Sequence, residues 1–299
     1  MRLRIALISG TMAGLVWLWV GPSFGANPPA GERKAVVRVI TRWNSDCDGN
    51  TRGDWDNMLD AWYDEIADGD GIPDGHGAKA WSKDGFYQNG NIVDSDFTDP
   101  NIVTWGNDDA DDRLDEDDVC LVGLHGSESS DAERWTAAVR VDEAGDGNCW
   151  ANQHHMSFGD TNDLEFLHIS SCHSMCEDNW PEWFGSFNKV HQIDGFHGIM
   201  YIGSTLTSNY RDFGDDVFDI AIADAWLDNH YDPAHWYETW QDGDQCPVAY
   251  AVGTSENDTT TRRDQEEYDD EFSDVSNPTW YAVTYVGGCD PYKDPALPD

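Results

Sequence analysis

The chain has 299 residues, and a hydrophobic share of 39% with 15 Trp is enough to fill the core of one large or two ordinary domains. Its formal net charge is −41, with 58 acidic and 17 basic residues. This balance argues against nucleic acid as a partner, because no basic patch is present to neutralise phosphates. It is typical of a halophilic surface, on which salt screens the self-repulsion, and it favours basic substrates only weakly.

The start of the chain has the pattern of a signal peptide over residues 1–25. Arg2 and Arg4 precede an apolar run over residues 5–20, and the small residues up to Gly25 suit a signal-peptidase cut. We expect cleavage near Gly25, which would leave a secreted, periplasmic or cell-surface protein with no stable membrane association. An uncleaved anchor is the alternative, because the apolar run is near the lower limit for spanning a bilayer.

The next segments predict the beginning of an α/β domain. Residues 26–34 are a linker with Pro and Gly, and residues 35–40 are a mainly apolar run that predicts the first core strand. Apolar residues at helical spacing predict an amphipathic helix over residues 54–67. We expect a single domain over residues 35–289, followed by a loose, Pro-rich tail over residues 290–299.

A short acidic loop follows the predicted helix. Asp68, Asp70 and Asp74 lie in the sequence DGDGIPDG, which offers three carboxylates on a tight, Gly-rich turn to a hard, oxygen-seeking ion. The loop resembles thrombospondin-type and dockerin-type calcium loops, although Lys79 stands where an EF-hand would have Glu. It predicts a structural calcium ion, with a simple acidic turn as the alternative.

Two six-residue, mainly apolar runs are the most informative stretches of the chain. They cover residues 119–124 and 164–169, and each has Asp before it and small polar residues after it. This pattern is typical of strands in a covered, parallel sheet. His125 follows the first run and Cys172 follows the second, so both are expected outside the carboxyl ends of strands, where catalytic groups gather.

His125 and Cys172 have the side chains that acyl transfer needs. A thiol attacks as its thiolate, and a neighbouring imidazole acts first as base and later as acid. Their contact requires the two strands to be neighbours, with residues 127–163 as an excursion. Gly126 would let a substrate carbonyl approach the backbone, and the amides of Gly126 and Cys172 would hold an oxyanion. The alternative is a structural cysteine beside a turn histidine.

The order of the motifs resembles a known clan of cysteine peptidases. An apolar strand that ends in His-Gly, followed by one that ends in a small residue and Cys, is similar to the pattern in caspases, gingipains, legumains and separases. LVGLHG, DLEFLHISSC, the Trp-Phe segment after it, IDGFHGIMYIG and FGDDVFDIAIADAW, in that order, resemble more closely an uncharacterised bacterial, often secreted, caspase-like domain family. The resemblance covers residues 35–253 and is strongest over residues 119–226.

The resemblance implies a caspase-like three-layer sandwich, in which helices flank a mostly parallel central sheet. It also implies that a strand over residues 195–203 leads to Ser204 and Thr205, which would bind substrate. Apolar periodicity predicts a single helix over residues 215–229, and residues 280–286 predict an extra antiparallel strand at an edge of the sheet.

Seven cysteines in an exported chain imply at least one free thiol if the others pair. With Cys172 as the nucleophile, six remain for three bridges, whose connectivity stays open. Cys176 is the rival of Cys172, because the two could form a local redox pair or ligate a metal. The adjacent His154 and His155 do not predict zinc, because neighbouring side chains of a strand point to opposite faces.

These observations together predict a secreted cysteine endopeptidase that hydrolyses peptide or protein substrates through His125 and Cys172. Catalysis would require no cofactor. The alternative is a catalytically inactive, caspase-like binding or surface module, stabilised by calcium. Arg262 and Arg263 lie in a polar stretch that we expect to be an exposed excursion, where they would be a site for processing.

Overall fold

The structure is a computed structural model. It describes the backbone of Leu3–Ser9 and residues 33–43, 47, 51–67, 81–90, 92–110, 113–129, 134–140, 149–159, 164–234, 242–270 and 272–299. The predicted calcium loop with Asp68, Asp70 and Asp74 lies outside the described residues. All the cysteines, His125 and Gly126 lie within them.

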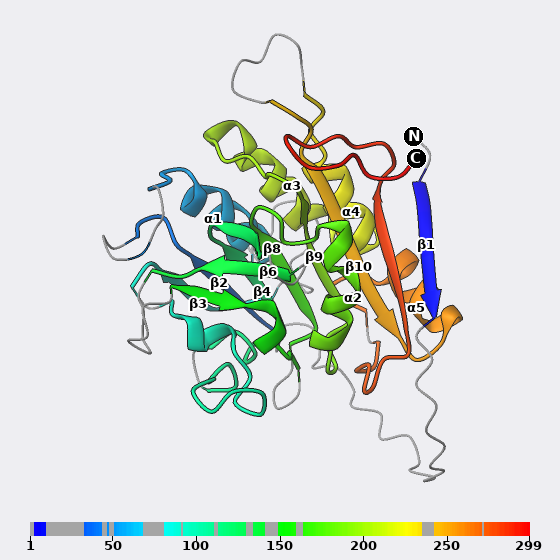
Figure 1. Cartoon of the computed structure of the whole chain (residues 1–299), viewed down its shortest axis with the longest axis horizontal. Coiled ribbons are helices and arrows are strands. Elements are labelled where there is room, and N and C mark those ends of the chain that lie inside the picture. The colour runs from blue at the N-terminus through cyan, green and yellow to red at the C-terminus, as the bar shows by residue number, and fades with distance from the viewer. Residues whose placement is uncertain are drawn as a thin grey trace.

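The main feature of the described chain is an eight-stranded sheet (Figure 1). Across it, the strands are ordered β1 (Leu3–Ser9), β11 (Trp280–Val286), β10 (Cys246–Gly253), β9 (Gln192–His197), β8 (Phe166–Ser170), β4 (Val119–Gly123), β2 (Lys34–Val39) and β3 (Ser82–Gln88). The pairings from β9 to β3 are parallel, and those of β10 and β11 are antiparallel. The predicted mixed α/β class with a mostly parallel sheet is confirmed.

The central parallel strands are buried on both faces, as their apolar sequences require. Every residue of β4, β8 and β9 is buried. On one side, α1 (Trp55–Ile66) packs against α3 (Thr207–Asp216), α3 against α4 (Ile222–His230), and α4 against α5 (Glu256–Gln265). A large part of the core therefore lies between these helices and the sheet.

A second, smaller sheet and a short helix lie in front of the main sheet in Figure 1, on the side away from α3 and α4. The antiparallel sheet consists of β5 (Gly126–Ser129), β6 (Arg134–Ala138) and β7 (Trp150–Asn152), and the short helix is α2 (Trp180–Trp183). The short 3-10 helices are η1 (Asp94–Phe97), η2 (Gln153–His155), η3 (Glu177–Asn179), η4 (Phe184–Ser186) and η5 (Ser204–Leu206).

The helix predicted over residues 215–229 is wrong as a single element, because α3 ends at Asp216 and α4 begins at Ile222. A distant segment of the chain, which contains Glu266 and Tyr268, forms hydrogen bonds with residues at the break between the two helices. The backbone amide of Tyr268 donates to the Val217 carbonyl at 2.9 Å, and that of Ile222 donates to the Glu266 carbonyl at 2.9 Å. Local periodicity cannot reveal such tertiary hydrogen bonds.

The strand predicted over residues 195–203 is also corrected. β9 begins earlier and ends at His197, and the next residue, Gly198, has a positive φ of 74°. This left-handed backbone favours glycine and turns the chain out of the sheet. The Gly198 carbonyl then accepts a hydrogen bond from the His173 amide at 2.6 Å.

The polar stretch with Arg262 and Arg263 is not an exposed excursion. It forms α5, in which Arg262 is 3% and Arg263 is 5% exposed. Arg262 pairs with Asp258 at 3.1 Å and donates to the Ser273 carbonyl at 2.5 Å. A buried arginine pair in a helix does not offer an extended backbone to a protease, so the expectation of an exposed processing site is wrong.

The tail over residues 290–299 is packed rather than loose. Leu297 is 2% exposed, and its amide donates to the Cys289 carbonyl at 2.8 Å. The carbonyl of Pro295 lies 2.7 Å from Nε2 of His197, at the end of β9. The Pro-rich composition predicted a loose tail, but the buried Leu297 side chain and these hydrogen bonds hold the tail against the main sheet.

The edge next to β11 is occupied by β1, which pairs with it antiparallel from Leu3↔Val286 to Ser9↔Trp280. The antiparallel direction predicted for residues 280–286 is confirmed, although β11 is not the outermost strand. Cleavage near Gly25, as the sequence predicts, would remove β1 and leave β11 at the edge. None of the described helices is long and apolar enough to cross a membrane.

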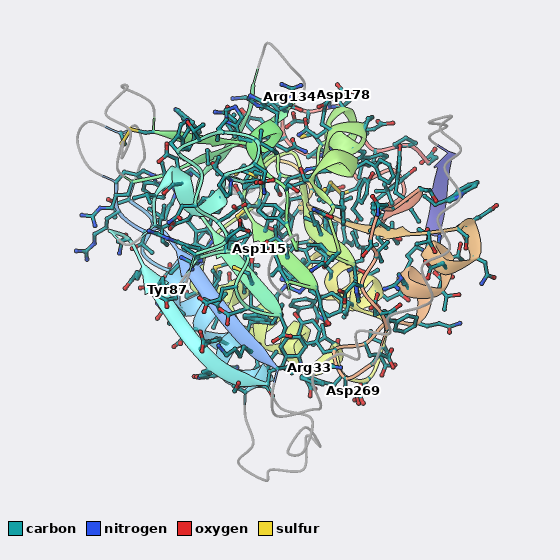
Figure 2. The ribbon with its side chains drawn as sticks, turned by 90° about the horizontal axis from the view of Figure 1, so that it is seen from below. Arg33, Tyr87, Asp115, Arg134, Asp178 and Asp269 are labelled. Carbon is teal, nitrogen blue, oxygen red and sulfur yellow. A yellow bond between two sulfur atoms is a disulfide. The ribbon has the colours of Figure 1, made fainter. Side chains whose placement is uncertain are left out.

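The amino end of β2 is fixed by a buried arginine. The Arg33 guanidinium donates to the backbone carbonyls of Tyr268 and Asp270. Figure 2 shows Arg33 beside Asp269 at this end of the sheet, whereas Tyr87 marks the other end, where β3 finishes. The segment that breaks the α3–α4 connection is therefore also tied to the start of the first core strand.

A buried carboxyl group makes stability depend on pH. Asp108 is fully buried, and both its oxygens lack a hydrogen-bond partner among the described residues. Burial, and then the nearby Asp115, Asp109 and Asp99, raise the pKa of Asp108 to about 9. Between the unfolded pKa of about 4 and this value, the folded chain holds one more proton than the unfolded chain. The free energy of unfolding should therefore fall as pH rises through this window.

Asp108→Asn should remove this contribution, because the amide carries no titrating proton. We expect the pH dependence of the unfolding free energy between pH about 5 and 8 to flatten by up to about 1 kcal/mol per pH unit. Denaturant unfolding in buffer free of divalent cations measures it. Asp178→Asn is the matched control, because Asp178 is exposed. An unchanged slope in Asp108→Asn would contradict the assignment.

Candidate active site

The register of β4 and β8 brings His125 and Cys172 to the same place. Each residue of β4, from Val119↔Phe166 to Gly123↔Ser170, lies opposite the residue 47 positions further along the chain. His125 and Cys172 have this same separation, and each follows its strand end by two residues. The Leu124 amide continues the ladder by donating to the Ser170 carbonyl at 3.3 Å. The two residues therefore lie side by side at the carboxyl edge of the sheet.

Gly126 is in close contact with the Cys172 backbone. A Cβ atom on Gly126 would lie 2.2 Å from the Cys172 carbonyl oxygen, 2.3 Å from Oγ of Ser171 and 2.4 Å from Nε1 of Trp135. Such distances leave no room for a side chain. Glycine is thus required here by the close approach of two chain segments, which brings the backbone of residue 126 against that of residue 172.

Two tryptophans pack against the ring of His125. The ring centroids of Trp43 and Trp55 lie 4.5 Å and 5.6 Å from that of His125. Trp55, at the start of α1, also donates from Nε1 to Oγ of Ser170 at 2.9 Å. Trp43 donates from Nε1 to the Ala138 carbonyl at 3.1 Å, which joins this wall to β6. Aromatic packing thus holds the imidazole, a role that the residue pattern around Trp43 and Trp55 did not predict.

Cys172 has a free thiol that is partly buried. Its Sγ lies 3.8 Å from the carbonyl oxygen of Met200, in the segment after β9. Burial raises the pKa of the Cys172 thiol, and the charge of Arg52 acts in the opposite direction. The resting group is therefore a neutral thiol, which needs a base to become a nucleophile.

A cavity of about 350 Å³ opens at the same edge of the sheet. It lies where β2 and β3 end and α1 begins, and its lining is polar: Thr41, Arg42, Thr51, Arg52, Gly53, Asp56, Gln88 and Asn89. It lies near the candidate dyad, because Trp43, the residue after Arg42 of the lining, packs against His125. The charge of Arg52, also in the lining, acts on the Cys172 thiol. Arg42 and Arg52 were not among the predicted site residues, and only the rarity of basic residues in this chain could have drawn attention to them.

Ser204 and Thr205 were expected to bind substrate. They are exposed at the start of η5, which leads into α3. The residue of this segment that contacts the Cys172 thiol is Met200, through its carbonyl. Ser204 and Thr205 therefore lie on the surface beyond the segment that reaches the sulfur atom.

The other cysteines divide into pairs and free thiols. Cys47 is bonded to Cys149, and Cys246 is bonded to Cys289. Cys120, Cys172 and Cys176 are free. The chain therefore has two disulfides and not the three that the cysteine count allowed. Two disulfides fit an extracellular or periplasmic protein. Cys172 is not bonded to Cys176, and the Sγ of Cys176 lies instead 3.7 Å from Nδ1 of His173.

Gly126→Ala should destabilise the fold, because the new methyl group would collide with backbone as well as side-chain atoms. We expect a loss of about 1–3 kcal/mol in the free energy of unfolding, measured by denaturant titration. Gly185→Ala is the control, since nothing lies within 4 Å of a Cβ there. Equal stability of the two variants would show that the strand ends are not in close contact.

The comparisons with known proteins give a family without an assigned function. The chain matches the family described as Domain of unknown function (DUF6345) over residues 60–285. This segment contains both His125 and Cys172. No curated protein matches the chain. The protein thus belongs to the DUF6345 family.

Proposed function

We propose that the protein is a caspase-like cysteine peptidase that hydrolyses peptide bonds through His125 and Cys172. The observation that carries the proposal is the β4–β8 register, which puts an imidazole and a free thiol at neighbouring strand ends. The layered arrangement of helices and a small sheet around a mostly parallel sheet is compatible with the caspase-like sandwich. The disulfides fit secretion, where such a peptidase would meet protein substrates.

The proposed reaction uses groups of this chain only. His125 takes the proton from the Cys172 thiol as the sulfur attacks the scissile carbonyl carbon. The amides of Gly126 and Cys172 donate to the oxyanion that forms. His125 then gives its proton to the departing amine, which leaves an acyl thioester on Cys172. Water, deprotonated by His125, attacks the thioester, and the carboxylic acid product leaves as the thiol regains its proton.

The raised pKa of Cys172 is compatible with this scheme, because the imidazole rather than the solvent would remove the proton. Proton transfer by a positioned base contributes about 100-fold to 10,000-fold to a rate. The same buried, neutral thiol also favours the alternative function, an inactive binding module of the same fold. The two functions differ in whether His125 changes the reactivity of Cys172.

The cavity beside the dyad indicates the kind of side chain that the site would accept. Arg42 and Arg52 line it, with Asp56 as the acidic member of the lining. A guanidinium group binds a carboxylate through two parallel hydrogen bonds. We therefore infer a preference for substrates with an acidic side chain next to the scissile bond, which opposes the weak preference for basic substrates expected from net charge.

The dyad is tested with His125→Gln and Cys172→Ala. We expect Cys172→Ala to abolish hydrolysis of a fluorogenic peptide library, and His125→Gln to lower it by about 100-fold or more. Iodoacetamide labelling at neutral pH, followed by mass mapping, should show slower alkylation of Cys172 in His125→Gln. His154→Gln is the control, because His154 is exposed on η2. Equal labelling rates in wild type and His125→Gln would favour the inactive module.

The substrate preference is tested with Arg52→Ala. We expect the ratio of kcat/KM for acidic over uncharged side chains to fall about tenfold or more, which corresponds to about 1.4 kcal/mol. Arg134→Ala serves as the control, since Arg134 lies on β6 and pairs with Glu182. The preference would be refuted if basic side chains were cleaved best by the wild type.

A further inference from the structure

We propose that Glu128, His173, Cys176 and Asp294 form a binding site for a divalent transition-metal ion of the zinc type. The four residues come from three separate segments of the chain. Glu128 belongs to β5, His173 and Cys176 lie in the turn after β8, and Asp294 belongs to the packed tail. The proposal does not depend on the proposed peptidase activity.

The distances between the ligand atoms suit a tetrahedral ion. One atom from each residue lies within 4.8 Å of all the others. Sγ of Cys176 is 3.7 Å from Nδ1 of His173, which is 3.6 Å from Oδ1 of Asp294. Bond lengths of about 2.3 Å to sulfur and about 2.0–2.1 Å to nitrogen and oxygen put tetrahedral ligand atoms about 3.3–3.6 Å apart. The contacts of His173 are close to this geometry, and side-chain rotation of the two carboxylates would bring the remaining atoms nearer.

The backbone around the cluster is specialised. His173 has a positive φ of 56°, which is uncommon for a residue with a Cβ atom. Its amide donates to the Gly198 carbonyl at 2.6 Å, and this contact holds the turn in place. Strained backbone of this kind concentrates at functional sites, where the surroundings maintain it.

A buried oxygen in the cluster has no protein partner. Oδ2 of Asp294 is shielded from solvent and accepts no hydrogen bond from the residues that the structure describes. A buried carboxylate oxygen without a partner is unfavourable, and a bound cation removes that cost. The carboxylates of Glu128 and Asp294 also leave net negative charge around the Cys176 thiol, which is 2% exposed, and a divalent ion would offset it.

The ligand types identify the class of ion. Thiolate and imidazole are ligands for zinc and similar transition metals, whereas calcium and magnesium take oxygen ligands. Four protein ligands complete the coordination of a tetrahedral ion, which is typical of a structural site, whereas a catalytic site keeps one position open for water or substrate. The ion would join β5, the turn that follows Cys172 and the tail, so it would fix the surroundings of the thiol without binding it.

The test is zinc binding by the full chain after treatment with a chelator and dialysis. We expect one zinc ion per chain by elemental analysis, and a higher Tm after zinc is restored. Cys176→Ser and Asp294→Asn should each weaken zinc binding by about tenfold or more. Cobalt(II) in place of zinc should give a thiolate-to-metal charge-transfer absorption in the wild type that Cys176→Ser loses.

Cys172→Ala is the matched control, because Cys172 is a free thiol directly before His173 but lies outside the cluster. It should bind zinc as tightly as the wild type. Far-UV circular dichroism checks that the variants fold, and Asp294→Asn changes only a tail residue. The proposal would be overturned by zinc binding that is equally tight in Asp294→Asn and wild type, by loss of zinc in Cys172→Ala, or by absence of bound zinc in the wild type.

Discussion

The parallel pairing of β4 with β8 fixes the positions of most other elements. A slip of one residue would move every side chain of a strand to the opposite face. The slip is opposed by His168 of β8, which is fully buried and lies 2.8 Å from Asp194 on β9 and 2.6 Å from the Tyr268 hydroxyl. Loss of such partners costs about 1–3 kcal/mol for each buried polar group. One polar residue in an apolar strand thus holds β8 in register with β9, its neighbour on the side away from β4.

Long-range contacts then build the surroundings of the aligned strand ends. The segment that contains Tyr268 accepts from Arg33 at the start of β2 and interrupts the helix between α3 and α4. The disulfide of Cys47 with Cys149 joins the loop after β2 to the start of β7. The tail returns to the end of β9 and adds Asp294 to the turn after Cys172. The proposed dyad and the proposed metal site are therefore neighbours on one edge, built from different parts of the chain.

Local features of the sequence were sufficient for most of the sheet and the first helix. Apolar runs predicted β2, β4, β8 and β11, and helical spacing predicted α1. The errors arose where another segment overrides local preference, as at the α3–α4 break and at Gly198 after β9. The tail was misjudged for a related reason, because its composition is that of a loose end whereas its single apolar anchor, Leu297, is buried against distant residues.

Residue type and periodicity alone established that a histidine and a cysteine follow two apolar strands, because both are local properties of the chain. The folded chain was needed to show that these strands are neighbours and that their pairing aligns their carboxyl ends. It was also needed to show that Cys172 stays free while four other cysteines pair, and that Asp294 lies close to His173. Such pairings depend on which distant surfaces are buried against each other and on the entropy lost when the loops between them close. No short stretch of residues determines either of these.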